Sequence, residues 1–348
     1  MRRWVGAVSI GCLLAVCLWR PGQAELWQPS GGHTQVPIWP GTPPDARRLP
    51  GPEYAVTRVS AGTSPRFAGK PVTGVGNVSQ PTMTIYAPRR RSTNAAVVVF
   101  PGGGFEALAI DLEGTEACDW LTSDGITCIL LKYRVPSTPY DWRCNCRPDD
   151  LTLPVPALED AQRTMRLVRF HARDWHIDPH KIGVLGFSAG GYLVAAISTN
   201  FNRRLYAPAD AADQQSARPD FAMAIYPGHL ATAGGTLNPN VAVSRQTPPT
   251  FLVQAEDDYT DGVRQSLVYY MALAKTHVPA ELHIYPRGGH AFGLRMTNLP
   301  ITHWPELADA WLRTIGVIGT STEVTRAAIH QSHRPHGERP RQDSGAVP

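Results

Sequence analysis

Charge is scarce in this sequence. Charged residues make up 18% of the 348 residues, and the formal net charge is only +4. Three arginines, Arg2, Arg3 and Arg20, lie within the first 24 residues, so the rest of the chain carries +1. Proteins that hold nucleic acid or an anionic membrane by electrostatics need a basic patch or stripe, and this balance supplies none. We therefore expect no nucleic-acid partner.

Long apolar runs are absent beyond the N-terminus. Residues 5–18 are largely apolar and follow Arg2 and Arg3, but the run is too short to span a bilayer comfortably as a permanent helix. Gly22-Gln23-Ala24 then supplies small residues at the positions that a signal peptidase reads. We interpret residues 1–24 as a signal peptide that is cleaved after Ala24. The expected product is secreted or periplasmic, with no stable membrane span.

Cysteine is also rare, with six residues in the chain, two of them in the leader. In an exported protein, the even number that remains permits two disulfides in three possible connectivities. Buried free thiols at Cys118 and Cys128 are an equally acceptable alternative. No C-x-x-C or paired histidine pattern accompanies the cysteines, so we expect no metal site. The four cysteines beyond the leader are Cys118, Cys128, Cys144 and Cys146.

Proline and glycine, by contrast, are plentiful, with 32 and 31 residues. They are frequent between residues 25 and 80, where the only strand-like piece lies near residues 54–59. This composition predicts an irregular N-terminal arm that lies on the core and forms no separate domain. Residues 319–348 are mostly polar and lack sustained apolar periodicity, which predicts a disordered tail.

The remaining segment, residues 81–318, alternates between two kinds of apolar pattern. Short continuous apolar runs predict strands buried on both faces, and longer stretches with apolar residues three or four apart predict helices. Such alternation predicts a single α/β domain with a mainly parallel sheet and helices on both faces. The predicted strands are 82–87, 95–100, 126–133, 182–185, 221–226, 250–254 and 280–285, and the predicted helices are 158–175, 191–197, 263–275 and 304–315.

One junction between a strand and a helix carries a catalytic motif. Gly186-Phe187-Ser188-Ala189-Gly190 matches the G-x-S-x-G nucleophile elbow. A strand that turns directly into a helix pushes its turn residue outward, and the flanking positions must be small because helix and strand pass in contact. The helix N-terminus behind Ser188 offers unpaired N–H groups to an oxyanion. We predict that Ser188 is a nucleophile.

A glycine run follows an earlier buried strand. Pro101-Gly-Gly-Gly-Phe105 can present backbone N–H groups to a cavity with no Cβ in the way. Oxyanion holes in acyl-transfer enzymes pair such a loop with the N–H group of the residue after the nucleophile. We predict that Gly103, Gly104 and Ala189 are the oxyanion donors.

The candidate acid and base residues follow two later predicted strands. Glu256, Asp257 and Asp258 follow the strand 250–254, and any of them could hold a histidine in its useful tautomer. Their position in the turn favours Asp258, with Asp257 second. His290 lies in a Gly-rich loop after the strand 280–285 and is the predicted base. We expect His229 to lie at the surface or to have a structural role.

Together these segments resemble the α/β-hydrolase esterases of the acetyl-xylan esterase and BD-FAE-like group, related to the hormone-sensitive-lipase-like carboxylesterases. The order Ser188, Asp258, His290 is the α/β-hydrolase order. The resemblance implies the α/β-hydrolase fold and activity on short acyl esters of sugars or plant polysaccharides. One departure is the insert at residues 139–154. The motifs lie between about residues 80 and 316: Pro101 to Phe105, Asp111 to Gly114, Lys132 to Arg134, Gly186 to Gly191, Glu256 to Asp258 and Gly288 to Gly293.

The resulting functional prediction is a serine carboxylic-ester hydrolase that deacetylates acylated sugars or xylan. It would act through an acyl-enzyme and require no cofactor. A general short-chain carboxylesterase is the first alternative. A serine exopeptidase is a second, although such enzymes usually carry a propeller or another large domain, for which the segment before Ser188 leaves little room. A non-catalytic carbohydrate-binding protein would require a broken triad, and no member is missing here.

Overall fold

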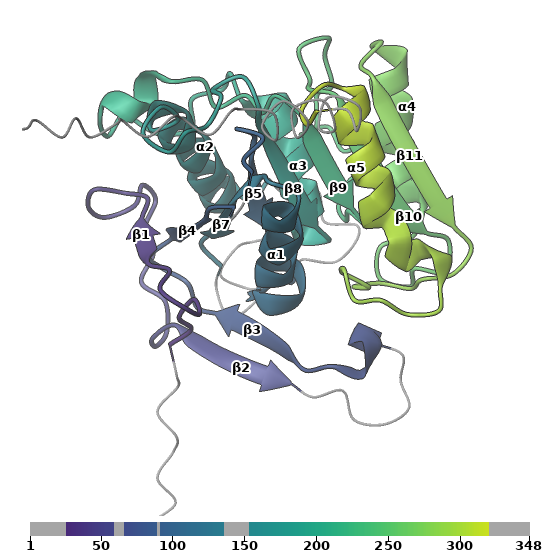
Figure 1. Cartoon of the computed structure of the whole chain (residues 1–348), viewed down its shortest axis with the longest axis horizontal. Helices are drawn as coiled ribbons and strands as arrows, with labels where there is room; N and C mark the ends of the chain where they lie inside the picture. Colours follow the sequence, from purple (N-terminus) through teal and green to yellow (C-terminus); the bar gives the residue numbers. More distant parts are fainter. Residues whose placement is uncertain (1–25, 59–65, 89–90, 136–152, 320–348) are drawn as a thin grey trace, which may run out of the picture.

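The protein is built around one eight-stranded sheet. A computed structural model describes residues 26–58, 66–88, 91–135 and 153–319 (Figure 1). The strand order is β1-β4-β7-β5-β8-β9-β10-β11. Pairs β1–β4 and β4–β7 are antiparallel, and all the others are parallel. The strands are β1 (Gln35–Pro37), β4 (Thr82–Tyr86), β5 (Ala96–Phe100), β7 (Thr127–Lys132), β8 (Ile182–Phe187), β9 (Ala222–Ile225), β10 (Thr250–Ala255) and β11 (Ala280–Tyr285).

The central strands are buried along their whole length. Every residue of β5, β7, β8, β9 and β10 is buried. Continuous apolar runs are what a strand covered on both faces requires, and each of these strands was predicted within two residues at either end. The sheet confirms the expected mainly parallel α/β architecture.

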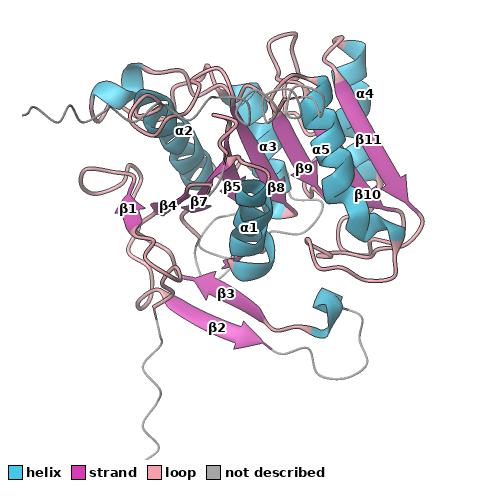
Figure 2. Ribbon diagram, in the orientation of Figure 1, coloured by secondary structure: helices cyan, strands magenta, loops and turns pink. Residues whose placement is uncertain are grey.

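Helices cover both faces of the sheet (Figures 1 and 2). Helices α1 (Glu116–Ser123) and α5 (Trp304–Thr314) lie on one face, where the rings of Trp120 and Trp304 meet edge to face at 5.2 Å. On the other face lie α2 (Val155–Phe170), α3 (Ala189–Asn200) and α4 (Arg264–Lys275). Helix α1 has no counterpart among the predicted helices. Within the described residues, no helix is long and apolar enough to cross a membrane.

The N-terminal arm differs from the prediction. It was expected to be irregular, but it contains β1 and two strands of a second, three-stranded antiparallel sheet in the order β2-β3-β6. The third strand, β6, comes from the segment just after the glycine run. The strand-like piece predicted near residues 54–59 is confirmed as β2. The strands β1, β3 and β6 were not predicted, because such short, half-exposed strands carry little apolar alternation. These strands are β2 (Tyr54–Arg58), β3 (Val72–Gly76) and β6 (Ala107–Ala109).

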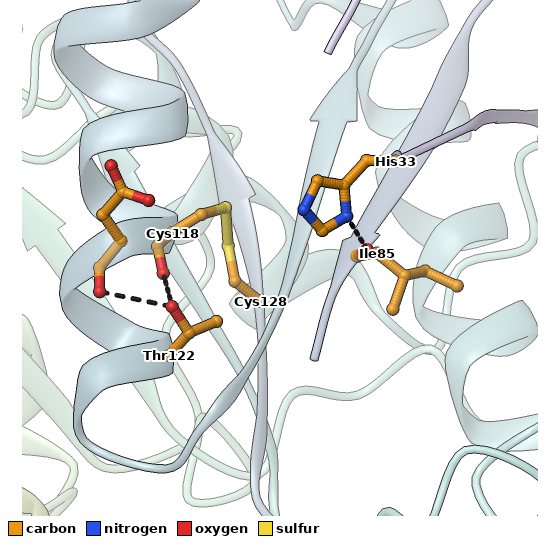
Figure 3. Close-up of a disulfide and its surroundings, with 6 residues drawn as sticks. His33, Ile85, Cys118, Thr122 and Cys128 are labelled. Atoms are coloured by element: carbon orange, nitrogen blue, oxygen red, sulfur yellow. Dashed lines mark hydrogen bonds between the residues drawn. A yellow bond between two sulfur atoms is a disulfide. The ribbon is translucent and has the colours of Figure 1, made fainter. Parts of the chain in front are cut away.

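A disulfide joins Cys118 in α1 to Cys128 in β7 (Figure 3). Their Cα atoms are 5.2 Å apart, within the usual range for such a bridge. The hydroxyl of Thr122, one turn further along α1, donates a hydrogen bond to the Cys118 carbonyl at 2.7 Å. Of the two alternatives for Cys118 and Cys128, a disulfide or buried free thiols, the structure has the disulfide. The predicted signal peptide, most of the insert with Cys144 and Cys146, and all but the first residue of the predicted tail lie outside the described residues.

Candidate active site

Ser188 occupies the junction between β8 and α3 in a strained backbone conformation. Its φ is 52° and its ψ is −119°, a combination that non-glycine residues rarely adopt. The turn needs glycine on both sides: a Cβ on Gly186 would lie 2.1 Å from the Gly190 carbonyl oxygen, and one on Gly190 would lie 2.0 Å from the Phe100 carbonyl oxygen. The predicted close crossing of strand and helix is therefore present.

Three predicted side chains form one hydrogen-bonded chain. Nε2 of His290 lies 2.9 Å from Oγ of Ser188, and Nδ1 lies 2.8 Å from Oδ2 of Asp258. An ionised carboxylate can only accept a hydrogen bond, so Nδ1 carries the proton and Nε2 is free to accept from the serine hydroxyl. The three side chains come from loops after β8, β10 and β11, which end at the same edge of the sheet because these strands are parallel.

The structure also separates the three candidate acids. Asp258 is buried and accepts hydrogen bonds from the Gln254 side chain and from the backbone N–H groups of Thr260 and Asp261, at 2.9–3.0 Å. Asp257 instead accepts from the N–H groups of Gly288 and Gly289, so it shapes the loop that carries His290. Glu256 is exposed. Asp258 is therefore the partner of His290.

The surroundings of His290 favour its charged form. Burial lowers its pKa, but the hydrogen bond and negative charge of Asp258 raise it, and the charges of Asp261 and Glu113 add to this effect. The net result is a pKa above the ordinary histidine value. A histidine in this environment accepts a proton more readily than a free imidazole does.

The glycine run borders the same cavity as Ser188 and His290. This cavity has a volume of about 320 Å³, and both Gly103 and Gly104 line it. Both glycines have positive φ, 132° and 67°, which suits the left-handed turn. A Cβ on Gly103 would lie 2.2 Å from the Ala107 carbonyl oxygen, so the first of them must be glycine. Ala189, the third predicted donor, is the first residue of α3 and is buried.

A buried carboxylate that the sequence reasoning did not single out supports both halves of this site. Oε2 of Glu113 accepts the N–H group of Gly102 at 2.7 Å, and Oε1 accepts the hydroxyl of Tyr226 at 2.9 Å. The Tyr226 ring lies 5.0 Å from the His290 ring. Burial raises the pKa of Glu113, although the nearby charge of His290 opposes the shift. Glu113 lies in one of the motifs quoted above, but nothing in the motif indicates what the side chain contacts.

Further residues complete the cavity wall. Phe67 and Val72 come from the N-terminal arm, which was not predicted to reach the site. His229 and Asp261 also line the cavity, although His229 was expected at the surface or in a structural place. Their backbone positions, in loops after β9 and β10, share the sheet edge at which Ser188 lies. Among the described residues, no group of three or more histidine, cysteine or acidic side chains could hold a metal ion.

Known protein sequences resemble most of this chain. A family described as alpha/beta hydrolase fold matches residues 152–294. An acetylxylan esterase from Xylanibacter ruminicola is 31% identical over 235 residues, which are 61% of this chain and 43% of that protein. Endo-1,4-beta-xylanase B from Butyrivibrio fibrisolvens is 28% identical over 225 residues, 58% of this chain and 33% of that protein. The chain thus spans less than half the length of these curated relatives.

Solved structures cover more of the chain. An acetyl ester-xyloside bifunctional hydrolase from Caldicellulosiruptor lactoaceticus is 31% identical, with a TM-score of 0.61, and the match covers 82% of this chain and 97% of that one. Esterase 2 from Thermogutta terrifontis, solved after phosphorylation by paraoxon, is 24% identical, with a TM-score of 0.57, and the match covers 70% and 92%. The second likeness concerns the fold alone.

Proposed function

We propose that this chain, which belongs to the α/β-hydrolase fold family, is a serine carboxylic-ester hydrolase that removes acetyl groups from acylated sugars or xylan. The observation that carries the proposal is the hydrogen-bonded chain Ser188–His290–Asp258, of which Ser188 and His290 line a cavity. The acetylated-carbohydrate substrate is supported by the names of two relatives, an acetylxylan esterase and an acetyl ester-xyloside hydrolase.

The first half of the reaction forms an acyl-enzyme. His290 takes the hydroxyl proton of Ser188 at Nε2 while Oγ attacks the ester carbonyl carbon. The carbonyl oxygen becomes an oxyanion that accepts hydrogen bonds from the N–H groups of Gly103, Gly104 and Ala189. The positive imidazolium is stabilised by Asp258 at Nδ1. The tetrahedral intermediate then collapses, the bond from the acyl carbon to the sugar oxygen breaks, and His290 gives its proton to that oxygen, which leaves as the sugar hydroxyl.

The second half repeats this sequence with water. His290 removes a proton from a water molecule, whose oxygen attacks the acyl carbon on Ser188. The second tetrahedral intermediate expels Oγ, which takes back the proton from His290, and acetate leaves. Both halves use only groups of the protein and one water molecule, so the proposed reaction requires no cofactor.

Ser188→Ala is the direct test. Wild-type protein is expected to hydrolyse p-nitrophenyl acetate and to release acetate from acetylated xylan, and the variant should lose both activities by about three orders of magnitude or more, because the attacking atom is gone. Labelling of the wild type, but not the variant, by a fluorophosphonate identifies the nucleophile. Esterase activity retained by the variant would refute the assignment of Ser188.

The same assay tests the alternatives. A preference for butyrate or octanoate esters over acetate, with no release from xylan, would indicate a general carboxylesterase. Hydrolysis of an aminoacyl amide in preference to an aryl acetate would indicate the exopeptidase.

The predicted signal peptide supports a secreted or periplasmic enzyme. N-terminal sequencing of the exported protein would test this location, because cleavage after Ala24 makes Glu25 the first residue.

A further inference from the structure

Part of the polar wall of the cavity beside Ser188 takes no step in the reaction just described. That part includes His229 and Asp261. Phe67, Val72 and Leu112 supply apolar surface elsewhere around the same cavity. Ligand sites are commonly apolar with a few fixed polar groups that set orientation and specificity.

Asp261 is an unusual residue to find at this position. Its side chain is only 6% exposed, and Oδ2 lies 3.8 Å from Nε2 of His290, on the side of the imidazole that faces Ser188. Asp258 already occupies the opposite nitrogen. The carboxylate packs against Gly228, where a Cβ would lie 2.6 Å from Oδ1. Burial of a carboxylate costs free energy unless partners are supplied, and burial raises the pKa of Asp261. The charges of His290 and His229 and a hydrogen bond with Ser188 oppose this rise, so the carboxylate lies directly beside the nucleophile.

His229 lines the same cavity and packs against neighbouring aromatic rings. Its ring contacts the rings of Phe105 and Tyr192, with centroids 6.0 and 5.8 Å away, and its carbonyl oxygen accepts the Asn238 amide at 2.8 Å. The residue is buried, and Nδ1 has no hydrogen-bond partner among the described residues. His229 also interacts electrostatically with Asp261. Because Nδ1 is enclosed, Nε2 is the one ring nitrogen of His229 that could meet a ligand in the cavity, beside the Asp261 carboxylate.

We propose that His229 and Asp261 bind a hydroxyl group of the substrate alcohol next to the scissile ester, and so select polyhydroxylated alcohols such as sugars. A hydroxyl group donates one hydrogen bond and accepts others, which matches an acceptor-only carboxylate beside an imidazole. A cationic group fits less well, because His290 becomes positively charged in the same cavity during the reaction. This inference rests on the proposed esterase function.

Two acetate esters that differ by one hydroxyl test it. They are cyclohexyl acetate and trans-2-hydroxycyclohexyl acetate, and each kcat/KM is divided by the rate of hydrolysis by hydroxide to remove intrinsic reactivity. Wild type should prefer the hydroxylated ester by about 10- to 100-fold, the effect of one hydrogen bond to a charged group. The ratio is independent of the fraction of active protein, so partial misfolding of a variant does not disturb it.

Variants assign the preference to residues. Asp261→Leu keeps a branched side chain without acceptors and should bring the ratio close to one, whereas Asp261→Asn keeps one weaker acceptor and should be intermediate. His229→Phe keeps the ring between Phe105 and Tyr192 but removes both nitrogens, and should also lower the ratio. Asp174→Asn makes the same chemical change at a carboxylate that is 74% exposed, and should keep the wild-type ratio.

Equal rates for the two esters in wild type, or a ratio unchanged in both Asp261→Leu and His229→Phe, would overturn the inference. This failure is distinct from failure of the proposed function. Hydrolysis that depends on Ser188 but ignores the added hydroxyl would leave the esterase standing and remove only the role of the pair. Hydrolysis that survives Ser188→Ala would remove the esterase mechanism itself.

Discussion

At the scale of single residues, the charge around His290 determines how the site responds to pH. Burial alone would lower the pKa of this histidine, but Asp258 at Nδ1, followed by the charges of Asp261 and Glu113, raises it above the ordinary histidine value. The proposed mechanism needs the neutral form, since only a free Nε2 can accept the serine proton. The activity should therefore rise with pH through this raised pKa.

Asp258→Asn is expected to change both the level and the pH dependence of activity. Without the carboxylate, burial dominates and the pKa of His290 falls, so the acidic limb of kcat/KM should move to lower pH. The plateau should fall by about 10⁴-fold, because an amide does not hold the imidazole in the required tautomer. Measuring kcat/KM for p-nitrophenyl acetate between pH 5 and 9 in both proteins checks this prediction.

Asp257→Asn is the matched control for that experiment. Asp257 is the neighbouring acid that the sequence left as the second choice, and it contacts the backbone of Gly288 and Gly289, not the imidazole. Its replacement should leave the acidic limb in place. A limb that moved in Asp257→Asn and stayed in Asp258→Asn would reverse the two assignments.

At the scale of secondary-structure elements, the disulfide fastens α1 to β7 across 10 positions of sequence. Both cysteines are fully buried, so the bridge lies within the core. A crosslink of this kind stabilises mainly by restricting the unfolded chain, and it contributes more as the closed loop lengthens. Because the closed loop is short, we expect the stabilisation from this disulfide to lie near the lower end of the range usual for disulfides.

Reduction of the disulfide should lower the free energy of unfolding by about 2–3 kcal/mol. Urea unfolding followed by circular dichroism, with and without dithiothreitol, measures the difference. The double variant Cys118→Ala/Cys128→Ala lacks this bridge, so dithiothreitol should no longer shift the midpoint of its urea transition through it. A wild-type midpoint that is insensitive to the reductant, with reduction verified by thiol labelling, would contradict the prediction.

At the scale of the whole molecule, Arg295 joins the N-terminal arm to the catalytic edge. It follows His290 in sequence, pairs with Glu116 of α1 at 2.7 Å, and donates to the carbonyl oxygens of Phe67, Lys70 and Pro71 at 2.9–3.1 Å. Phe67 is itself part of the cavity wall. One guanidinium therefore holds a remote segment in place beside the proposed nucleophile.

Arg295→Ala should loosen this wall and raise KM more than it lowers kcat, because the contacts among Ser188, His290 and Asp258 remain. The lost charge-assisted hydrogen bonds should lower the free energy of unfolding by about 2–3 kcal/mol. Faster proteolytic cleavage within residues 26–80, together with steady-state kinetics on p-nitrophenyl acetate, would register the change.

Arg295→Lys is the graded control, since one ammonium group cannot reproduce the fork of the guanidinium and should give an intermediate result. An unchanged KM with unchanged cleavage in Arg295→Ala would show that the arm is held by other contacts.

The sequence by itself determined the features that depend on neighbouring residues. The buried strands were recognisable because strands covered on both faces need unbroken apolar runs, as in β5 and β8. The turn at Ser188 was recognisable because only small residues fit where a helix crosses a strand so closely. The positions of Asp258 and His290 after strands followed from the same local patterns, together with the resemblance to a known family.

Tertiary structure alone decided everything that depends on contacts between distant segments. Asp258 rather than Asp257 meets His290 because of how two loops fold over the sheet edge, and the two acids are adjacent in sequence. The arm that was expected to be irregular supplies Phe67 to the cavity through a strand pairing and an arginine more than 200 residues away. Glu113, His229 and Asp261 carry no periodicity or spacing that marks them, because burial beside a cavity is a property of the folded chain.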